Sequence, residues 1–196
     1  MPRSKLSLIS ASQVKGLTTA QLSAFTTAHI AYLDTKDVLA LTTEQLNSLQ
    51  SEVLAAFSTA QIRALSTAQL AGLSTTQLAA FSTSDMLALS TKQLRALTTE
   101  QIASLGTDQL VALSTRQTAY LTTAQVAALT SAQINKLASD DLQAMTTAQI
   151  RALNSDQLSN LSTDQLVLMQ SKDIAAISAS QVGDLTTSAV ANLTTA

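Results

Sequence analysis

The sequence contains no cysteine, no tryptophan, one proline and four glycines, and aromatic residues make up only 3% of it. Without cysteine there is neither a disulfide nor a thiolate metal site. Charged residues amount to 12%, and the formal net charge is −2. This weak charge excludes the basic surface excess that binding to nucleic acid or to an acidic membrane requires.

Long uninterrupted apolar runs are also missing, although apolar residues make up 46% of the 196 residues. That share is enough for a real core, but no run is long enough to span a bilayer, so we expect a soluble chain without membrane insertion. The N-terminal stretch MPRSKLSLISAS has a short apolar part that serines interrupt. It predicts no signal peptide, so any export would need another route.

What the sequence does contain is one octapeptide, roughly L-S/T-T-x-Q-L-x-A, repeated from end to end. The first position of the octad is apolar without exception from Ile9 to Leu193, and the sixth is apolar from Val14 to Val190, apart from Thr118. The eighth position is usually Ala, and the third is nearly always Thr or Ser. The frame is never lost, so we predict a single continuous repeat domain over residues 1–196.

Each octad contains the signals that begin a helix. The second position is mostly Ser or Thr, and its exceptions Asp34, Asn154 and Gly106 are also residues favoured at a helix N-cap. Three residues later comes Gln, or sometimes Asp, which gives the Ser/Thr-x-x-Gln spacing of a capping box. The two apolar positions then correspond to N′ and N4, the pair that forms a hydrophobic staple. The octad therefore predicts one helix of about six residues.

Three other architectures fit the pattern less well. In one long helix the apolar stripe would rotate by roughly 80° per octad, so a coiled coil is excluded. A β-solenoid is disfavoured by the abundance of Ala, Leu and Gln and by the scarcity of Gly and Asn. Helical hairpins of two octads would produce a sixteen-residue alternation, which is not visible. We therefore predict an all-α solenoid, a tight superhelix of very short helices with three or four octads per turn.

In that superhelix the first and sixth positions lie inside, and the eighth, mostly Ala, lets neighbouring helices approach closely. The Thr at the third position is a mediocre helix former. We hypothesise that its hydroxyl bonds to the backbone of an adjacent turn and builds a polar ladder.

The sequence predicts no catalytic, cofactor-binding or metal-ligating residue, and hence no enzyme and no cofactor. His29, the only histidine, stands at the Gln position and is interpreted as a substituted capping residue. Asp140 and Asp141 are adjacent, but their octad positions point the two side chains apart. Tyr32 and Tyr120 replace Ala at the eighth position, where they fill core space or widen a groove.

The unit Leu121-Thr122-Thr123-Ala124-Gln125-Val126-Ala127-Ala128 resembles the LTTAQ-type short repeats of long repetitive bacterial proteins, some of them on the surface or secreted. The resemblance covers essentially the whole chain and implies a repeat fold, with no site residues to carry over. The unit is also similar to the LTxxQVxxI opening of TAL-type DNA-binding repeats. Their longer, basic repeat and base-reading loop are missing here, so DNA binding is not implied.

Two classes of function remain. The first is a non-catalytic structural protein, a spacer, stalk or filament subunit, because the last octads keep ordinary apolar residues and would stack end to end. The second is a binding module that presents regular Thr and Gln positions to a protein, a glycan or ice. The distribution of charges at the fourth and seventh positions distinguishes them. Clustered charges favour binding, and evenly scattered charges favour a scaffold.

Overall fold

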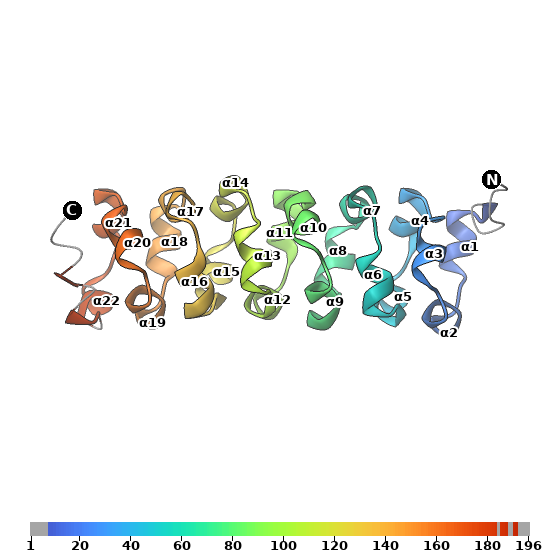
Figure 1. Cartoon of the computed structure of the whole chain (residues 1–196), viewed down its shortest axis with the longest axis horizontal. Coiled ribbons are helices and arrows are strands. Elements are labelled where there is room, and N and C mark those ends of the chain that lie inside the picture. Colours follow the sequence, from blue (N-terminus) through green and yellow to red (C-terminus); the bar gives the residue numbers. More distant parts are fainter. Residues whose placement is uncertain (1–7, 184, 188–189, 192–196) are drawn as a thin grey trace. The chain divides into compact units, whose positions relative to one another are not determined.

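The chain is all-helical in a computed structural model (Figure 1), which describes residues 8–183, 185–187 and 190–191. The first seven residues and Leu193, which the sequence analysis includes in the repeat, lie outside the described residues. Within the described residues each octad forms one helix of four to six residues, and no strand is present. The prediction of an all-α solenoid is confirmed. None of the described helices combines the length and apolar character needed to cross a membrane.

The helices divide between two compact units, Met1–Leu97 and Thr98–Ala196. We describe each unit by itself, and the single continuous domain stays a prediction. The first unit contains α1 (Ala11–Lys15), α2 (Thr19–Ser23), α3 (Thr27–Ile30), α4 (Thr35–Ala40), α5 (Thr43–Ser48), α6 (Ser51–Ala55), α7 (Thr59–Ala64), α8 (Thr67–Ala71), α9 (Thr75–Ala79), α10 (Thr83–Ala88) and α11 (Thr91–Ala96). The second contains α12 (Thr99–Ser104), α13 (Thr107–Val111), α14 (Thr115–Ala119), α15 (Thr123–Ala128), α16 (Ser131–Lys136), α17 (Ser139–Gln143), α18 (Thr147–Ala152), α19 (Ser155–Ser159), α20 (Thr163–Val167), α21 (Ser171–Ile174) and α22 (Ala179–Gly183).

A reciprocal pair of hydrogen bonds begins most of these helices. At α15 the Thr122 hydroxyl accepts from the Gln125 backbone N–H at 3.1 Å, and the Gln125 side-chain oxygen accepts from the Thr122 N–H at 2.9 Å. Asp34 and Asn154 accept in the same way at α4 and α19. Ala138, before α17, has no side chain with which to do so. The bonds satisfy backbone donors that a helix start otherwise leaves unpaired.

Each helix ends because the first residue of the next octad leaves the helical conformation. Leu129 follows α15 with φ −58° and ψ 139°, and Thr130 then stands at φ −73° and ψ 157° as the next N-cap. No described residue has a positive φ. Since every junction uses conformations open to ordinary residues, the fold needs few glycines.

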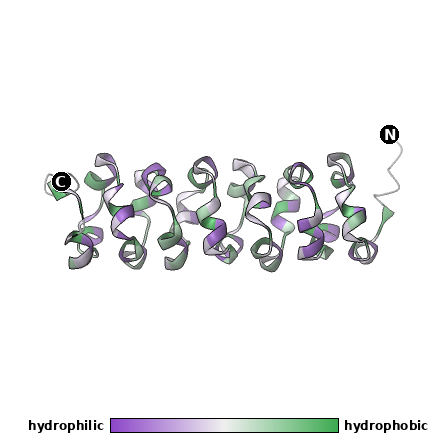
Figure 2. Cartoon of the chain, turned by 90° about the horizontal axis from the view of Figure 1, so that it is seen from below, coloured by the Kyte–Doolittle hydropathy of each residue, from purple (hydrophilic) through white to green (hydrophobic). Residues whose placement is uncertain are grey.

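The core consists of the first and sixth octad positions, as predicted. The sixth-position side chains from Val14 to Ile134 are buried, and the first-position residues from Leu33 to Leu161 are almost as deeply buried. Figure 2 shows polar and apolar residues alternating within the short helices. Because a helix of five or six residues is far too short to be stable alone, this packing stabilises the fold.

The fifth-position glutamines also lie inside, which the sequence analysis did not predict. Gln157 is fully buried, and its amide nitrogen donates to the carbonyls of Val126 at 3.0 Å and Leu129 at 2.6 Å. Equivalent bonds reach back 28 to 31 residues in both units, for example from Gln45 and Gln69 in the first and from Gln133 and Gln165 in the second. One amide therefore caps its own helix and ties it to the preceding turn.

These contacts define the superhelical turn within each unit. Helices three octads apart pack together, as α1 does with α4 and α12 with α15. The glutamine bonds, in turn, link each helix to the one four octads earlier. A reach of 28 residues equals three and a half octads, so each turn holds between three and four of them. The predicted range of three or four is thus narrowed to a value between the two.

The cross-turn bonds described above come from the Gln amides, and the hydroxyl ladder hypothesised for the third-position Thr stays a prediction. Thr43 packs closely against Gly72, at an eighth position on the next turn, where an added Cβ would meet the Thr43 methyl group. Thr115 directs its hydrogen bond to the Asp141 carboxylate. At this junction the third position faces the eighth position of the neighbouring turn, and the approach is too close for the Cβ of any residue larger than Gly unless Thr43 shifts.

Candidate functional site

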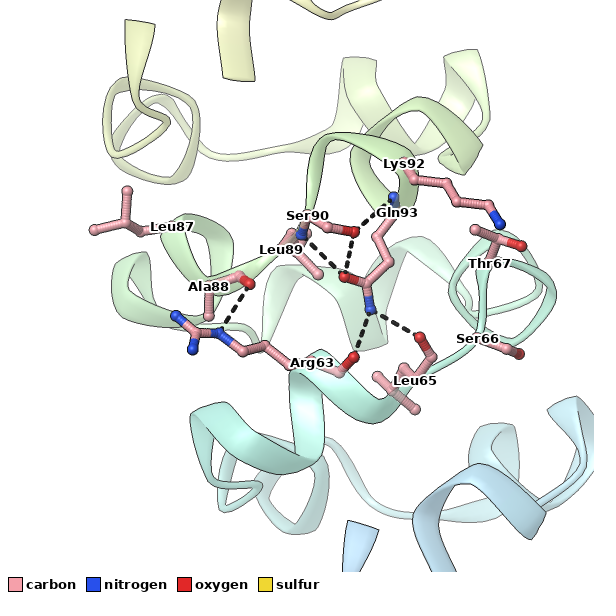
Figure 3. Close-up of a pocket in the computed structure, with 10 residues that line it drawn as sticks. All are labelled: Arg63, Leu65, Ser66, Thr67, Leu87, Ala88, Leu89, Ser90, Lys92 and Gln93. Carbon is pink, nitrogen blue, oxygen red and sulfur yellow. Dashed lines mark hydrogen bonds between the residues drawn. The ribbon is translucent and has the colours of Figure 1, made fainter. Parts of the chain in front are cut away.

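A surface groove of about 620 Å³ lies between neighbouring turns of the first unit (Figure 3). Arg63 and Ser66 line it from one turn, and Leu87, Ser90 and Lys92 line it from the next. A smaller groove of about 440 Å³ is lined by residues at the same octad positions four octads earlier, including Asp34 and Ser58. The groove is therefore a product of the repeat, and the variable fourth and seventh positions decide its chemistry.

The polar groups of the larger groove are mostly engaged within the chain. Arg63 donates through Nε to the Ala88 carbonyl at 3.3 Å, and the Ser90 hydroxyl donates to the Gln93 side-chain oxygen at 2.8 Å. Figure 3 shows the Arg63 guanidinium and the Lys92 ammonium on opposite sides of the Gln93 amide. Since the two cations diverge, they do not form a site for one small anion.

His29 lies where its octad position placed it. Its Nδ1 accepts from the Thr26 backbone N–H at 2.9 Å, which is the role of Gln in other octads. The ring is exposed and stands 5.2 Å from the Phe25 ring, measured between centroids. Among the described residues no group of three or more potential ligands of the His, Asp or Glu type could hold a metal ion.

The two adjacent carboxylates occupy different environments. Asp140 is exposed, whereas Asp141 is buried at a Gln position. Burial raises the pKa of Asp141, an effect that the Thr115 hydroxyl and the Ala138 backbone N–H partly oppose and that the Asp140 charge reinforces. Asp173, at the same position in α21, is also buried, and its Oδ1 has no hydrogen-bond partner. Asp cannot supply the second amide bond of Gln, so these octads lack a cross-turn donor.

The tyrosines are surface residues, so the prediction that they fill the core is wrong. Tyr32 and Tyr120, at the eighth position, are 44% and 45% exposed. The Arg116 guanidinium lies over the Tyr120 ring at 5.8 Å from its centroid. The phenylalanines at the first position behave differently, since Phe57 and Phe81 are buried.

Exposed charges gather by sign around the turns of the first unit. Its exposed bases lie on helices that contact one another through α1 with α4, α4 with α7, and the Gln93 bonds from α11 to α7. These bases, which we call the basic stack, are Lys15, Lys36, Arg63, Lys92 and Arg95. Glu44 and Glu52 lie on the following helices α5 and α6. Figure 1 shows α4 and α7 along one edge of this unit and α5 along the opposite edge.

The second unit shows the same segregation. Its exposed acids lie on α12, α13, α19 and α20, all of which contact α16, and on the neighbouring α17. These acids, which we call the acidic stack, are Glu100, Asp108, Asp140, Asp156 and Asp164. The bases Arg116, Arg151 and Lys172 lie on α14, α18 and α21, of which α18 contacts the other two, and α14 also contacts α17 with Asp140.

The sequence analysis did not find this segregation, although a signal for it was present. Glu44, Glu100 and Asp156 stand at the same octad position and follow one another at intervals of seven octads, and so do Glu52, Asp108 and Asp164. Within one unit, where a turn holds between three and four octads, seven octads correspond to about two turns. The interval has no meaning until the number of octads per turn is known.

Comparison with known proteins gives a family but no individual relative. The ALTTAQ repeat family matches five overlapping segments, residues 14–51, 47–83, 78–115, 107–139 and 134–171. Comparison with curated proteins finds no match. The segments together cover most of the chain and the helices that carry both the glutamine bonds and the two charged stacks. The chain therefore belongs to the ALTTAQ repeat family.

Proposed function

We propose that this chain is a non-catalytic structural repeat protein whose copies stack end to end as subunits of a filament. The observation that carries the proposal is the glutamine ladder. Each turn receives amide donors from the turn that follows and offers its own to the turn before, with the same reach of 28 to 31 residues in both units. A second copy that continued the screw would meet the same donors, acceptors and apolar positions.

Such a contact is heterologous, since one side of a turn meets the other side of the next. Heterologous contacts that do not close give fibres. The apolar first and sixth positions would continue from copy to copy in the same way, so burial and hydrogen bonding would favour the same arrangement.

Light scattering and negative-stain electron microscopy over a concentration series test the proposal. We expect the particle mass to rise with concentration and fibres of uniform width to appear. The growth should persist at high salt, because apolar contacts and amide hydrogen bonds are screened little by ions. Strictly monomeric particles at the highest concentration would contradict end-to-end stacking.

The second candidate is a binding module, and one observation favours it. Charges at the fourth and seventh positions are segregated, which a uniform scaffold does not require. The surface that binds would differ from the one expected from the sequence, because the fifth-position glutamines are buried from Gln45 to Gln165 and cannot face a glycan or ice. Exposed charged side chains, Ser and Thr hydroxyls and the two tyrosines are available instead.

Titration with heparin and with an uncharged dextran, followed by calorimetry, tests this second candidate. Binding to either one by chains that remain monomeric would support the binding module. Failure of both would leave the charged stacks without a glycan partner.

A further inference from the structure

We infer that copies of this protein also associate side by side, with the basic stack of one copy docked on the acidic stack of a second copy. This contact goes beyond the end-to-end assembly proposed above and does not depend on it. The occupant is a second copy of this chain because the chain itself supplies both members of a complementary pair.

The exposed charges of the basic stack and the acidic stack are opposite in sign and equal in number. The basic stack has five exposed cations, and Asp34 is the one exposed acid on the same helices, which leaves +4. The acidic stack has five exposed anions, and Lys136 on α16 is the one base among them, which leaves −4. Asp34 is engaged at the start of α4, where its carboxylate accepts from the backbone N–H groups of Lys36 and Asp37, which also holds its pKa below the usual value.

Spacing matches as well. In the acidic stack Asp156 follows Glu100 by seven octads, and Asp164 follows Asp108 by the same interval. In the basic stack Lys92 follows Lys36 by seven octads. Both units make glutamine bonds of the same reach, so the same interval covers the same number of turns in each. One pair of cations in the basic stack, Lys36 and Lys92, therefore recurs at the interval of two pairs of anions in the acidic stack.

The charges are available for such a contact. The stack side chains are exposed, and none of them forms an ion pair with another described residue. The groove between Arg63 and Lys92 also lets acidic side chains of the second copy enter between turns, with one cation on each side. Complementary charges of this kind orient partners and accelerate their encounter.

The alternative occupant is a polyanion held by the basic stack alone. It would leave the acidic stack unexplained, although that stack has the same number of exposed charges and shares one seven-octad interval with the basic stack. A second copy accounts for both stacks with one contact, so the observations favour it.

Charge reversal on the full chain tests the inference. One variant carries Lys36→Glu, Arg63→Glu and Arg95→Glu, and the other carries Glu100→Lys, Asp108→Lys and Asp164→Lys. All six side chains are exposed, so we expect both variants to fold, and far-UV circular dichroism checks this. Association is measured by sedimentation velocity at low salt and at a tenfold higher salt concentration.

For the parent chain we expect the side-by-side component to weaken about tenfold or more between about 50 mM and about 500 mM NaCl, because the screening length falls from roughly 14 Å to roughly 4 Å. Each variant alone should lose that component. An equimolar mixture of the two variants should regain it, since one then carries only acidic stacks opposite the basic stacks of the other. End-to-end stacking would respond to neither the salt nor the reversals.

Matched controls are Lys36→Arg with Arg63→Lys and Glu100→Asp with Asp108→Glu, which keep every charge and should associate like the parent. The inference is overturned if single variants associate as the parent does, or if their mixture does not associate. It is also overturned if the parent shows no salt-sensitive component while heparin binds to its basic stack, since a polyanion is then the partner.

Discussion

Each fifth-position glutamine uses both ends of its side-chain amide. The oxygen of Gln157 accepts from the Asn154 backbone N–H at 2.8 Å, and the nitrogen donates to carbonyls of the preceding turn. At neutral pH only an amide has an acceptor and a donor on one flat group of this length. The octad therefore requires Gln, and Glu would serve the helix start but not the turn.

The two roles of the Gln157 amide, as acceptor at the helix start and as donor to the preceding turn, predict the effect of Gln157→Glu. The carboxylate keeps the cap but faces the Val126 and Leu129 carbonyls without a proton to donate. We expect the variant to lose about 2–3 kcal/mol of unfolding free energy at pH 7. The loss should shrink at low pH, where a protonated Glu can donate again. Chemical denaturation at pH 7 and pH 4 measures both effects.

Gln21→Glu is the matched control, because Gln21 accepts from the Thr18 N–H at 2.8 Å but is exposed. It should change stability by less than about 0.5 kcal/mol. Equal losses at the two positions would mean that the cross-turn bond contributes nothing.

Asp141 gives a second residue-scale prediction. Its folded pKa is raised above 3.8 by burial, so the folded state holds this proton to a higher pH than the unfolded state does. The stability that this group contributes is therefore fully present below pH 3.8 and is lost as the pH rises through the folded pKa. Asp141→Gln restores the amide, and we expect it to stabilise the protein by about 1 kcal/mol at pH 7.

The gain from Asp141→Gln should diminish as the pH falls toward 3.8, because the parent carboxyl becomes protonated and its penalty disappears. Thermal melts from neutral pH down to about pH 3.5 measure this trend. A gain for Asp141→Gln that does not depend on pH would contradict burial as the cause.

The structural roles of some individual residues could be predicted from the sequence. The capping roles of Thr122, Asp34 and His29 follow from spacing alone, because a helix start is a local structure within four residues. The burial of Gln157 does not follow, because its partners lie 28 to 31 residues away. The surface position of Tyr32 was also missed, since the exposure of an eighth position depends on the packing of the neighbouring turn and differs from octad to octad.

At the scale of one helix, the N-cap is the feature that varies most. Ser90 and Ser114 accept from the third backbone N–H of α11 and α14, whereas Ala138 offers no acceptor to α17. Helices of five or six residues depend on their caps, because almost all their backbone donors lie in the first turn.

We therefore predict opposite effects from reciprocal changes. Ala138→Ser should stabilise the protein by about 0.5–1 kcal/mol, because a hydroxyl would accept from the Asp141 N–H. Ser114→Ala should destabilise it by about 1 kcal/mol. Urea denaturation measures both. Amide hydrogen exchange should show the change concentrated in α17 and α14, and effects of the same sign would contradict the capping argument.

At the scale of the whole molecule, near-equivalence of octads is the controlling property. Successive octads place the same residue types in the same surroundings. One whole octad can therefore be removed while every remaining residue keeps its position within its own octad. Removal of half an octad has a different effect. It leaves four residues where one helix and its junction need eight, so that helix cannot form.

Two deletions test this equivalence. Removal of residues 122–129 should keep the far-UV spectrum of a helical protein and shift Tm by only a few degrees. Removal of residues 122–125 should lower Tm by roughly 10 °C, because the four residues that remain of the octad cannot form its helix and Val126 is lost from the core. Loss of a core side chain costs about 3–5 kcal/mol, and 1 kcal/mol corresponds to about 2–4 °C at this size. Equal melting of both deletions would show that the frame does not matter.

The sequence by itself determined the local structure of this protein. Octad length, the N-cap with its partner three residues on, and the apolar first and sixth positions establish where each helix starts, where it stops and which side is buried. These features act within one octad, so a single octad contains the whole signal. The all-α solenoid follows from repeating it.

Only the tertiary structure decided how octads meet across a turn. The turn of between three and four octads comes from packing of helices three apart and from glutamine bonds to carbonyls 28 to 31 residues back. Those distances depend on the width of the apolar core and not on any one octad. The number of octads per turn also explains the seven-octad spacing of the charges. Only when that number is known can Glu100 and Asp156 be placed on one side of their unit and Arg116 and Arg151 on another.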